Sequence, residues 1–125
     1  MALLDGKVAI ITGAGRGLGA AYAQLLAKEG AAVVVNDVGR DGQGKFTAES
    51  VVAAIREAGG RAAANTQDIS TAEGGQSLLA TALDNFGRAD ILINNAGILR
   101  DKSFHNLEEA DWDLVIKVNL KSMYA

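Results

Sequence analysis

Short runs of consecutive apolar residues alternate along the chain with longer stretches in which apolar residues recur at helical spacing. Each short run is bounded by polar residues or glycine, which is typical of a β-strand buried on both faces. The predicted strands cover residues 8–11, 32–35, 61–65 and 91–93. The third has the weakest signal because alanine has a low strand propensity, and it is assigned mainly because the alternation requires a strand there.

Four helices are predicted between and after these strands. They cover residues 17–29, residues 46–58, a stretch that begins with the capping-box sequence Ser70-Thr71-Ala72-Glu73 and runs to residue 86, and a last stretch capped by Asn106 and Glu109. In the first helix, one apolar stripe is formed by Leu18, Ala21, Tyr22, Leu25 and Leu26. In the third, Gly74 and Gly75 weaken the prediction by roughly 1 kcal/mol each.

This alternation of strands and helices predicts the α/β class. The expected architecture is a doubly wound parallel sheet of the Rossmann type, with right-handed crossovers and helices on both faces. The chain has 125 residues, which suits one domain over residues 1–125. Ligands of such sheets bind at the carboxyl ends of the strands, so the residues that follow each strand are the first candidates for a site.

Composition excludes several other classes of protein. The net charge of −3 argues against a nucleic-acid partner, and no apolar stretch is long enough for a membrane span. With no cysteine and one histidine, neither a disulfide framework nor a metal site is expected. The first residues lack the basic flank and apolar core of a signal peptide, so we expect a cytoplasmic protein.

The first predicted strand leads through a glycine-rich turn directly into a helix, which is the context of a dinucleotide-binding fingerprint. The turn reads Thr12-Gly13-Ala14-Gly15-Arg16-Gly17-Leu18-Gly19. Because position 18 is leucine, the usual G-x-G-x-x-G spacing is replaced by G-x-x-x-G-x-G. Missing side chains let the backbone approach a pyrophosphate, and the helix start supplies N–H groups and positive potential. The alternative is a glycine turn that only packs the helix on the strand.

Asp37 follows the second predicted strand. An acidic residue about 20 residues beyond the glycine turn can bind the ribose hydroxyls, and it repels a 2′-phosphate. Arg16 is an opposing signal, because a cation in the turn can pair with a 2′-phosphate. We expect NAD rather than NADP, since an arginine can swing into solvent whereas the carboxylate repels directly. The alternative role for Asp37 is that of a helix or turn cap.

Together these motifs resemble the short-chain dehydrogenase/reductase family. Its cofactor motif matches Thr12-Gly13-x-x-x-Gly17-x-Gly19, and its second signature matches Asn94-Asn95-Ala96-Gly97, directly after the fourth strand. Within the family, residues 36–39 and 95–104 most resemble the hydroxyacyl-CoA dehydrogenase part of peroxisomal multifunctional enzymes and its bacterial relatives. The resemblance covers the whole chain and implies the N-terminal half of a classical member.

The resemblance also implies roles for single residues. The cofactor would be held by Gly13, Gly15, Arg16, Gly17, Leu18 and Gly19, by Asp37, by Asp68 and Ile69 at the adenine, and by Asn95, Ala96 and Gly97 on the nicotinamide side. Asn119 matches the catalytic asparagine that holds a water in a proton relay. On pattern alone, an amide on an apolar helix stripe is as often a packing or helix-bending residue. Asn94 and Asn95 are equally expected to join neighbouring strands.

The family's reaction is hydride transfer between NAD(P) and an alcohol or ketone, and it requires a tyrosine followed four residues later by a lysine. Tyr22 is followed by Leu26, and Tyr124 is the second-last residue, so neither fits. We therefore expect the strand order 3-2-1-4, truncated before the fifth strand, in a chain that is inactive alone. It would supply the cofactor half of an oxidoreductase, with a 3-hydroxyacyl thioester as the best candidate substrate. The alternatives are a non-catalytic dinucleotide-binding module and a fold remnant that binds nothing.

Self-association is also expected. The apolar run at residues 91–93 would lie at a sheet edge, and exposed apolar edges pair with another chain or segment. The last predicted helix is apolar around much of its circumference, as buried helices are. A homo-oligomer formed through either element is the expected assembly.

Overall fold

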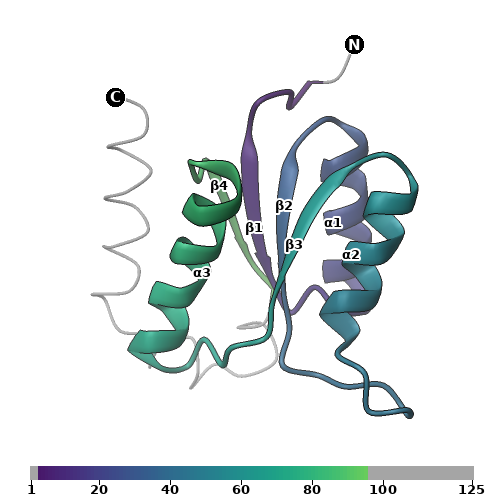
Figure 1. The fold of residues 1–125 in the computed structure, drawn as a ribbon, viewed down its shortest axis with the longest axis vertical. Helices are drawn as coiled ribbons and strands as arrows, with labels where there is room; N and C mark the ends of the chain where they lie inside the picture. The colour runs from purple at the N-terminus through teal and green to yellow at the C-terminus, as the bar shows by residue number, and fades with distance from the viewer. Residues whose placement is uncertain (1–2, 96–125) are drawn as a thin grey trace.

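The computed structural model describes residues 3–95, in which strands and helices alternate in the predicted order (Figure 1). The strands are β1 (Val8–Thr12), β2 (Ala32–Asn36), β3 (Arg61–Asn65) and β4 (Ile91–Asn94). The helices are α1 (Gly17–Lys28), α2 (Thr47–Glu57) and α3 (Ala72–Phe86). These seven elements confirm the prediction. The predicted last helix lies outside the described residues.

The four strands form one parallel sheet in the order β3-β2-β1-β4, as the resemblance implied. β1 pairs with β2 and β4, and β2 pairs with β3. The register places Asn36 beside Asn65 and Thr12 beside Asn94, so the last residues of the strands lie side by side. Because all four strands run in the same direction, the loops that follow them gather at one edge, the lower edge in Figure 1.

Helices cover both faces of the sheet. Alternate strand residues face opposite sides: Ile11 and Val33 pack with α1 and α2, and Ile10 and Val34 pack with α3. Figure 1 shows α1 and α2 together on one side of the sheet and α3 on the other. Every residue of β1 and β2 is buried, as expected for strands covered on both faces. Within residues 3–95, no helix has the length and apolar character needed to cross a membrane.

The apolar stripe predicted on α1 is not the face that meets the sheet. Its larger side chains are exposed: Leu18 (65%), Tyr22 (39%) and Leu25 (55%). The buried residues of α1 are Gly19 and Ala23, and Leu26 is only partly buried against the core. Small residues let the helix lie close to the strands, so this face could not be found from the spacing of large apolar side chains.

The capping box predicted before α3 is wrong by one residue. Thr71 is the N-cap, and its Oγ1 accepts a hydrogen bond from Gly74 N at 3.0 Å. The third helical position is then Gly74, which has no side chain to complete a capping box. The Ser70 N–H donates instead to Asp68 Oδ1 at 2.9 Å, which holds Ser70 outside the helix.

Strand β4 lies at the end of the described sheet. All four of its residues are only partly buried, in contrast to those of the neighbouring β1. The sequence of β4 is as apolar as that of an interior strand, but the strand lies at the edge of the described sheet. This position is the one expected for the order 3-2-1-4.

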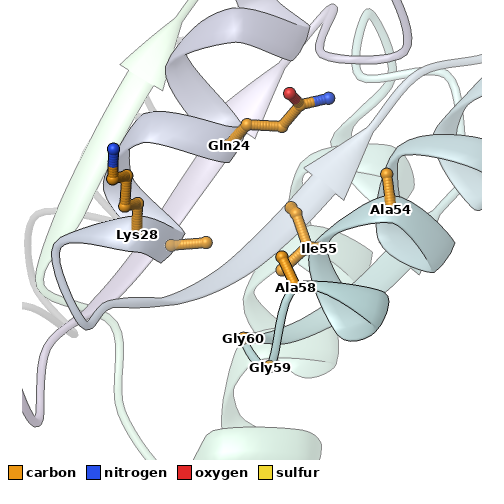
Figure 2. A pocket seen from close by; sticks show the side chains of 8 residues that line it. Gln24, Lys28, Ala54, Ile55, Ala58, Gly59 and Gly60 are labelled. Atoms are coloured by element: carbon orange, nitrogen blue, oxygen red, sulfur yellow. The ribbon is translucent and has the colours of Figure 1, made fainter.

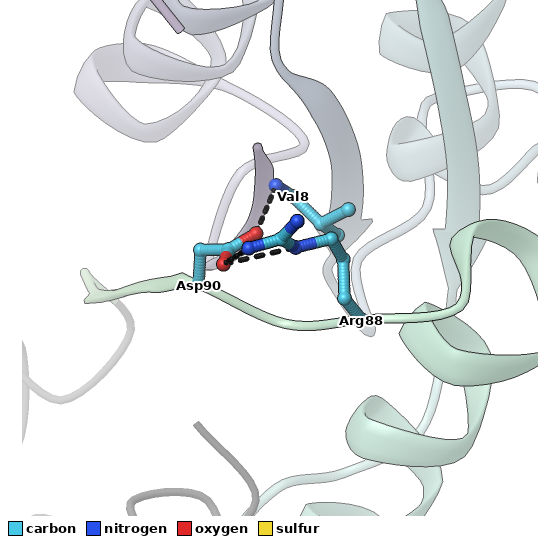
Figure 3. A network of polar contacts seen from close by, with 3 residues as sticks. All are labelled: Val8, Arg88 and Asp90. Atoms are coloured by element: carbon cyan, nitrogen blue, oxygen red, sulfur yellow. Dashed lines mark hydrogen bonds and ion pairs between the residues drawn. The ribbon is translucent and has the colours of Figure 1, made fainter. Parts of the chain in front are cut away.

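A polar network joins β4 to β1 at the opposite edge from the strand-end loops (Figure 3). Asp90 Oδ2 accepts a hydrogen bond from Val8 N at 2.8 Å, and Asp90 Oδ1 accepts from Arg88 Nη2 at 2.6 Å. Burial raises the pKa of the Asp90 carboxyl. The hydrogen bonds from Arg88 and Val8, together with the charges of Arg88 and Lys7, lower this pKa by more than burial raises it. The net pKa of Asp90 therefore lies below its usual value.

The substitution Asp90→Asn is expected to lower the free energy of unfolding near neutral pH but not in acid. Because the folded-state pKa is lowered, the ionised carboxylate stabilises fully above its unfolded-state pKa of about 3.9. That stabilisation is lost as the pH falls through the folded-state value. The amide oxygen of asparagine can still accept from Val8 N, so what is lost is the charge that strengthens this bond and the pair with Arg88, which costs about 1 kcal/mol. Urea unfolding at neutral and acidic pH measures the difference.

The matched control for this prediction is Asp84→Asn, which removes an exposed carboxylate from α3. It should change the free energy of unfolding by less than about 0.5 kcal/mol at either pH. If the free energy of unfolding of Asp90→Asn remains just as far below that of the parent in strong acid, the ionised carboxylate is not the stabilising group.

Candidate functional site

The loops that follow the four strands meet at the carboxyl edge of the sheet (Figure 1). They hold the predicted site residues that lie within residues 3–95, in the segments after β1, β2, β3 and β4. Ala96, Gly97 and Asn119 lie outside the described residues, and their predicted roles stay predictions. The fold thus brings together residues from four distant parts of the chain.

The glycines between β1 and α1 give this turn a single compact shape. Gly13 and Gly17 have φ angles of 63° and 62°, in the left-handed region that favours glycine. Gly19 is buried in the first turn of α1. A Cβ at Gly19 would overlap the carbonyl oxygen of Gly13 and lie 2.9 Å from Ala14 Cα. The packing role of these glycines, left as an alternative above, is therefore present.

The start of α1 is open to an anion. Arg16 is the N-cap residue and makes no capping hydrogen bond with its side chain, and the first turn contains no acidic residue. By contrast, α3 is capped by Thr71 and has Glu73 in its first turn. The first N–H groups of a helix have no acceptor within it, and with the helix dipole they favour a negative charge. This turn can therefore hold a phosphate group.

Gly15 lies against the first residue of α2. A Cβ at Gly15 would overlap Thr47 Oγ1 and lie 2.9 Å from Asp37 Oδ2. Thr47 is itself fixed, because its N and Oγ1 donate to Gly39 O at 3.0 and 3.2 Å. Glycine is required here by a contact with a residue far along the chain, which local sequence patterns do not reveal.

Asp37 joins the glycine turn to the loop after β2. Its Oδ2 accepts from Gly15 N at 3.0 Å, and its Oδ1 accepts from Gly39 N at 2.8 Å. The turn-capping alternative for Asp37 is therefore present in the structure. Each carboxylate oxygen has a further lone pair, so ribose hydroxyls can be bound as well.

Arg16 reaches the same loop from the other side. A Cβ at Gly39 would lie 2.9 Å from Arg16 Nη2 and 3.1 Å from Asp37 Oδ1. The Asp37 carboxylate and the Arg16 guanidinium therefore lie on either side of Gly39. These are the two groups whose charges have opposite effects on a 2′-phosphate.

The loop from residue 39 to residue 46 folds back on itself beside Asp37. Arg40 and Phe46 form an antiparallel bridge, and the Arg40 guanidinium lies 3.7 Å from the centroid of the Phe46 ring. Arg40 Nη1 also donates to Gly44 O at 2.7 Å. The polar, glycine-rich segment predicted as a loop therefore has a defined shape.

Asp68 and Ile69 lie between β3 and α3. Asp68 is exposed, whereas Ile69 packs against the α3 side of the core. The Asp68 carbonyl oxygen accepts from Thr71 Oγ1 at 3.1 Å, and a Cβ at Gly74 would overlap that oxygen. The start of α3 thus holds the backbone of Asp68 in place and leaves its carboxylate at the surface.

Asn94 at the end of β4 and Asn95 directly after it bind the segment around the glycine turn. Asn94 Oδ1 accepts from Thr12 Oγ1 at 2.9 Å, and Asn95 Nδ2 donates to Gly13 O at 3.2 Å. The predicted role in joining neighbouring strands is confirmed for Asn94, which joins β4 to β1. Asn95 instead joins the segment after β4 to the turn after β1. The second family signature therefore supports the shape of the first.

Sequence reasoning missed the amides at the ends of the other two strands. Asn36 and Asn65 are 2% and 6% exposed, and Asn36 Nδ2 donates to Asn65 Oδ1 at 2.9 Å. The signal that identified Asn94 and Asn95, a polar amide at the end of an apolar strand, is also present at Asn36. It was hidden because Asp37, the next residue, carries the more obvious chemistry.

A cavity of about 520 Å³ lies between α1 and α2, away from these loops. Figure 2 shows Lys28 and Ala58, near the C-terminal ends of the two helices, at its margin. Those ends lie at the amino edge of the sheet, where α/β proteins do not place their ligands. The described residues contain no cluster of three or more His, Cys, Asp or Glu that could hold a metal ion.

Known proteins are similar to this chain in both sequence and fold. The chain matches the short chain dehydrogenase family over residues 7–125. It is 49% identical to the peroxisomal multifunctional enzyme type 2 of Mus musculus over 124 residues, which cover 96% of this chain and 16% of that enzyme. A crystal structure of a short chain dehydrogenase from Mycobacterium avium has a TM-score of 0.72 at 43% identity, covering 98% of this chain and 45% of that one.

A third match carries a bound cofactor. A 7α-hydroxysteroid dehydrogenase complexed with NADH and 7-oxo glycochenodeoxycholic acid has a TM-score of 0.72 at 32% identity, over 92% of this chain and 47% of that one. The chain thus spans less than half the length of each of these three relatives. With its sheet order and glycine turn, the match over residues 7–125 shows that the chain belongs to the short-chain dehydrogenase family.

Proposed function

We propose that the chain supplies the cofactor-binding half of an NAD-dependent oxidoreductase that acts on an alcohol or ketone. The observation that carries this proposal is the glycine turn itself. Gly19 fits closely against the backbone of Gly13 and Ala14, and Gly15 fits against the side chains of Thr47 and Asp37. The N-cap residue Arg16 makes no capping hydrogen bond with its side chain, so the start of α1 is open. A cradle that a Cβ would fill, beside an open helix start, fits a dinucleotide pyrophosphate.

Each loop at the carboxyl edge of the sheet has its own role in this proposal. The first N–H groups of α1 bind the pyrophosphate, Asp37 accepts hydrogen bonds from the adenosine ribose, and Asp68 with Ile69 borders the adenine. Asn95 fixes Gly13 and so holds the turn at the cofactor. When bound, the nicotinamide accepts or donates the hydride.

Asp37 supports NAD over NADP. Its carboxylate bridges the backbone N–H groups of Gly15 and Gly39, so it is fixed where the ribose would lie. Arg16 is exposed and is free to turn toward solvent. The solved hydroxysteroid dehydrogenase relative, whose complex contains NADH, is in keeping with this preference.

The substitution Asp37→Asn is expected to reduce the preference for NAD over NADP by about tenfold, because it removes the charge that repels a 2′-phosphate. Calorimetric titration of the full-length protein with each dinucleotide measures the ratio of the two Kd values. Asp41→Asn is the matched control, because Asp41 also accepts backbone N–H bonds in this loop but does not contact Gly15. An equal change of the ratio in both variants would argue against a specific role for Asp37, and a parent protein that binds neither dinucleotide would refute the proposed function.

We propose a 3-hydroxyacyl thioester as the substrate, on the strength of the similarity to the peroxisomal multifunctional enzyme. The general acid/base must come from residues other than these 125, because they contain no tyrosine with a lysine four positions later. The same observation favours the second candidate, a non-catalytic dinucleotide-binding module. Cofactor reduction in the presence of NAD and a 3-hydroxyacyl thioester distinguishes the two: turnover by the full-length protein supports the enzyme, and binding without turnover supports the module.

We also propose that the protein forms a homo-oligomer. The partly buried apolar strand β4 at the end of the described sheet supports this proposal. Light scattering of the full-length protein measures its oligomeric state.

A further inference from the structure

Asn36 is a buried residue that contacts two of the segments assigned to the cofactor and directly precedes a third. It ends β2 and is 2% exposed. Its carbonyl oxygen accepts from Ala14 N of the glycine turn at 2.9 Å. Its Nδ2 donates to Asn65 Oδ1 at 2.9 Å and to Gln67 O at 3.0 Å, with a longer contact of 3.3 Å to Asn65 O. One side chain thus fixes the segment that leads out of β3.

The position of Asn36 in the chain places it next to both carboxylates of the site. Asp37 is the following residue, and its N–H donates to Asn65 O at 3.1 Å. Gln67, whose carbonyl Asn36 holds, directly precedes Asp68. The amide of Asn36 therefore fixes the backbone on which both carboxylates are carried.

The far side of this amide cluster is anchored to α3. Asn65 Nδ2 donates to Thr81 Oγ1 at 3.0 Å and to Ser77 Oγ at 3.2 Å. Asn65 Oδ1 also accepts from Gln67 N at 3.0 Å, which closes the turn after β3. Asn36 thus joins the strand before Asp37 to a loop that is itself fixed on a helix.

We propose that Asn36 is a positioning residue that sets the spacing of Asp37 and Asp68 for the adenosine half of the cofactor. The inference rests on the proposed function. A buried amide with its N–H groups engaged holds its acceptors in one arrangement. Its loss removes the hydrogen bond that holds Gln67 O, whereas Asn65 keeps its bonds from Asp37 N and Gln67 N. Replacement of Asn36 therefore weakens recognition of adenosine, while Asn95 on the nicotinamide side keeps its own contact with Gly13 O.

A purely structural role would have a different signature. A residue that only stabilises the fold lowers the free energy of unfolding without changing the relative affinity for different parts of the cofactor. The comparison therefore uses two half-cofactors: AMP, which carries the adenosine, and nicotinamide mononucleotide, which does not. The ratio of their Kd values is the readout, because a general loss of folded protein affects both alike.

The experiment compares the full-length parent protein with Asn36→Ala and with Thr81→Val by calorimetric titration of NAD, AMP and nicotinamide mononucleotide. Thr81→Val is the matched control because it removes a hydrogen bond from the same cluster on the side away from Asp68. Asn36→Ala is expected to raise the Kd for AMP and for NAD about tenfold and that for nicotinamide mononucleotide less than about twofold. Thr81→Val is expected to lower the thermal midpoint while leaving the ratio of the two half-cofactors unchanged.

An unchanged AMP affinity in a folded Asn36→Ala protein would overturn the inference, as would an equal loss of both half-cofactors. If that variant does not fold, Asn36→Ser decides the question by the same ratio, since serine keeps one donor in a smaller side chain. A parent protein that binds none of the ligands would instead refute the proposed function, and the inference with it. A parent that binds all three, beside variants with an unchanged ratio, would refute the inference alone.

Discussion

Gly19→Ala is expected to lower the affinity for NAD at least about a hundredfold and the free energy of unfolding by about 1–3 kcal/mol. The added Cβ overlaps the carbonyl oxygen of Gly13 and comes within 2.9 Å of Ala14 Cα. Both obstacles are backbone atoms, so no side-chain rotation can relieve them. The glycine turn must move away from α1, and the N–H groups proposed to bind the pyrophosphate move with it.

Two other glycines provide graded controls for this prediction. Gly17 has a φ of 62° but nothing within 4 Å of an added Cβ, so alanine there costs backbone strain of about 1–2 kcal/mol without an overlap. Gly42 has open space and no left-handed φ, so alanine there should be neutral within about 0.5 kcal/mol. Urea unfolding and NAD titration should rank the losses Gly19, Gly17 and Gly42, and a Gly19→Ala protein that binds like the parent would contradict the turn's described packing.

The second large effect is expected from Gly74→Ala, and its sign is opposite to that of helix propensity. In an exposed helix, alanine in place of glycine stabilises by about 1 kcal/mol. Here the added Cβ overlaps the carbonyl oxygen of Asp68 and lies 2.6 Å from its carbonyl carbon. We expect a net loss of about 1–3 kcal/mol and a weaker affinity for AMP, because Asp68 must shift.

Gln76→Ala is the matched control, since it shortens an exposed side chain of the same helix. It should leave both the free energy of unfolding and the affinity for AMP close to those of the parent. Denaturant unfolding gives the sign directly. A stabilised Gly74→Ala protein would mean that α3 does not approach Asp68 as closely as described.

The order of the elements was predictable because it depends on local patterns. The apolar runs of β1 and β2 and the glycines around them identify strands without knowledge of their neighbours. Even β3, with its weak alanine signal, was correctly required by the alternation of strands and helices. The glycine turn and Asp37 were recognisable for the same reason, since a strand, a turn and a helix follow one another directly.

What escaped prediction depends on contacts between distant residues. Gly15 must be glycine because Thr47 lies against it, and Gly74 because Asp68 does. Before the fold was known, Gly74 counted only as a weakness in a helix. The buried face of α1 was mistaken for similar reasons, because close approach to the sheet selects small residues there rather than large ones.

The contacts between β4 and the glycine turn also determine when the site can form during folding. Residues 82 positions apart are joined where Asp90 accepts from Val8 N, where Thr12 donates to Asn94 and where Asn95 donates to Gly13. Such non-local pairings form slowly, because a long loop must close before any contact rewards it. On the ribosome, β1, β2 and β3 emerge well before β4, so the nascent chain completes its glycine turn only after β4 has been synthesised and docked. Under the proposed function, dinucleotide binding would report on a late step in the folding of this segment.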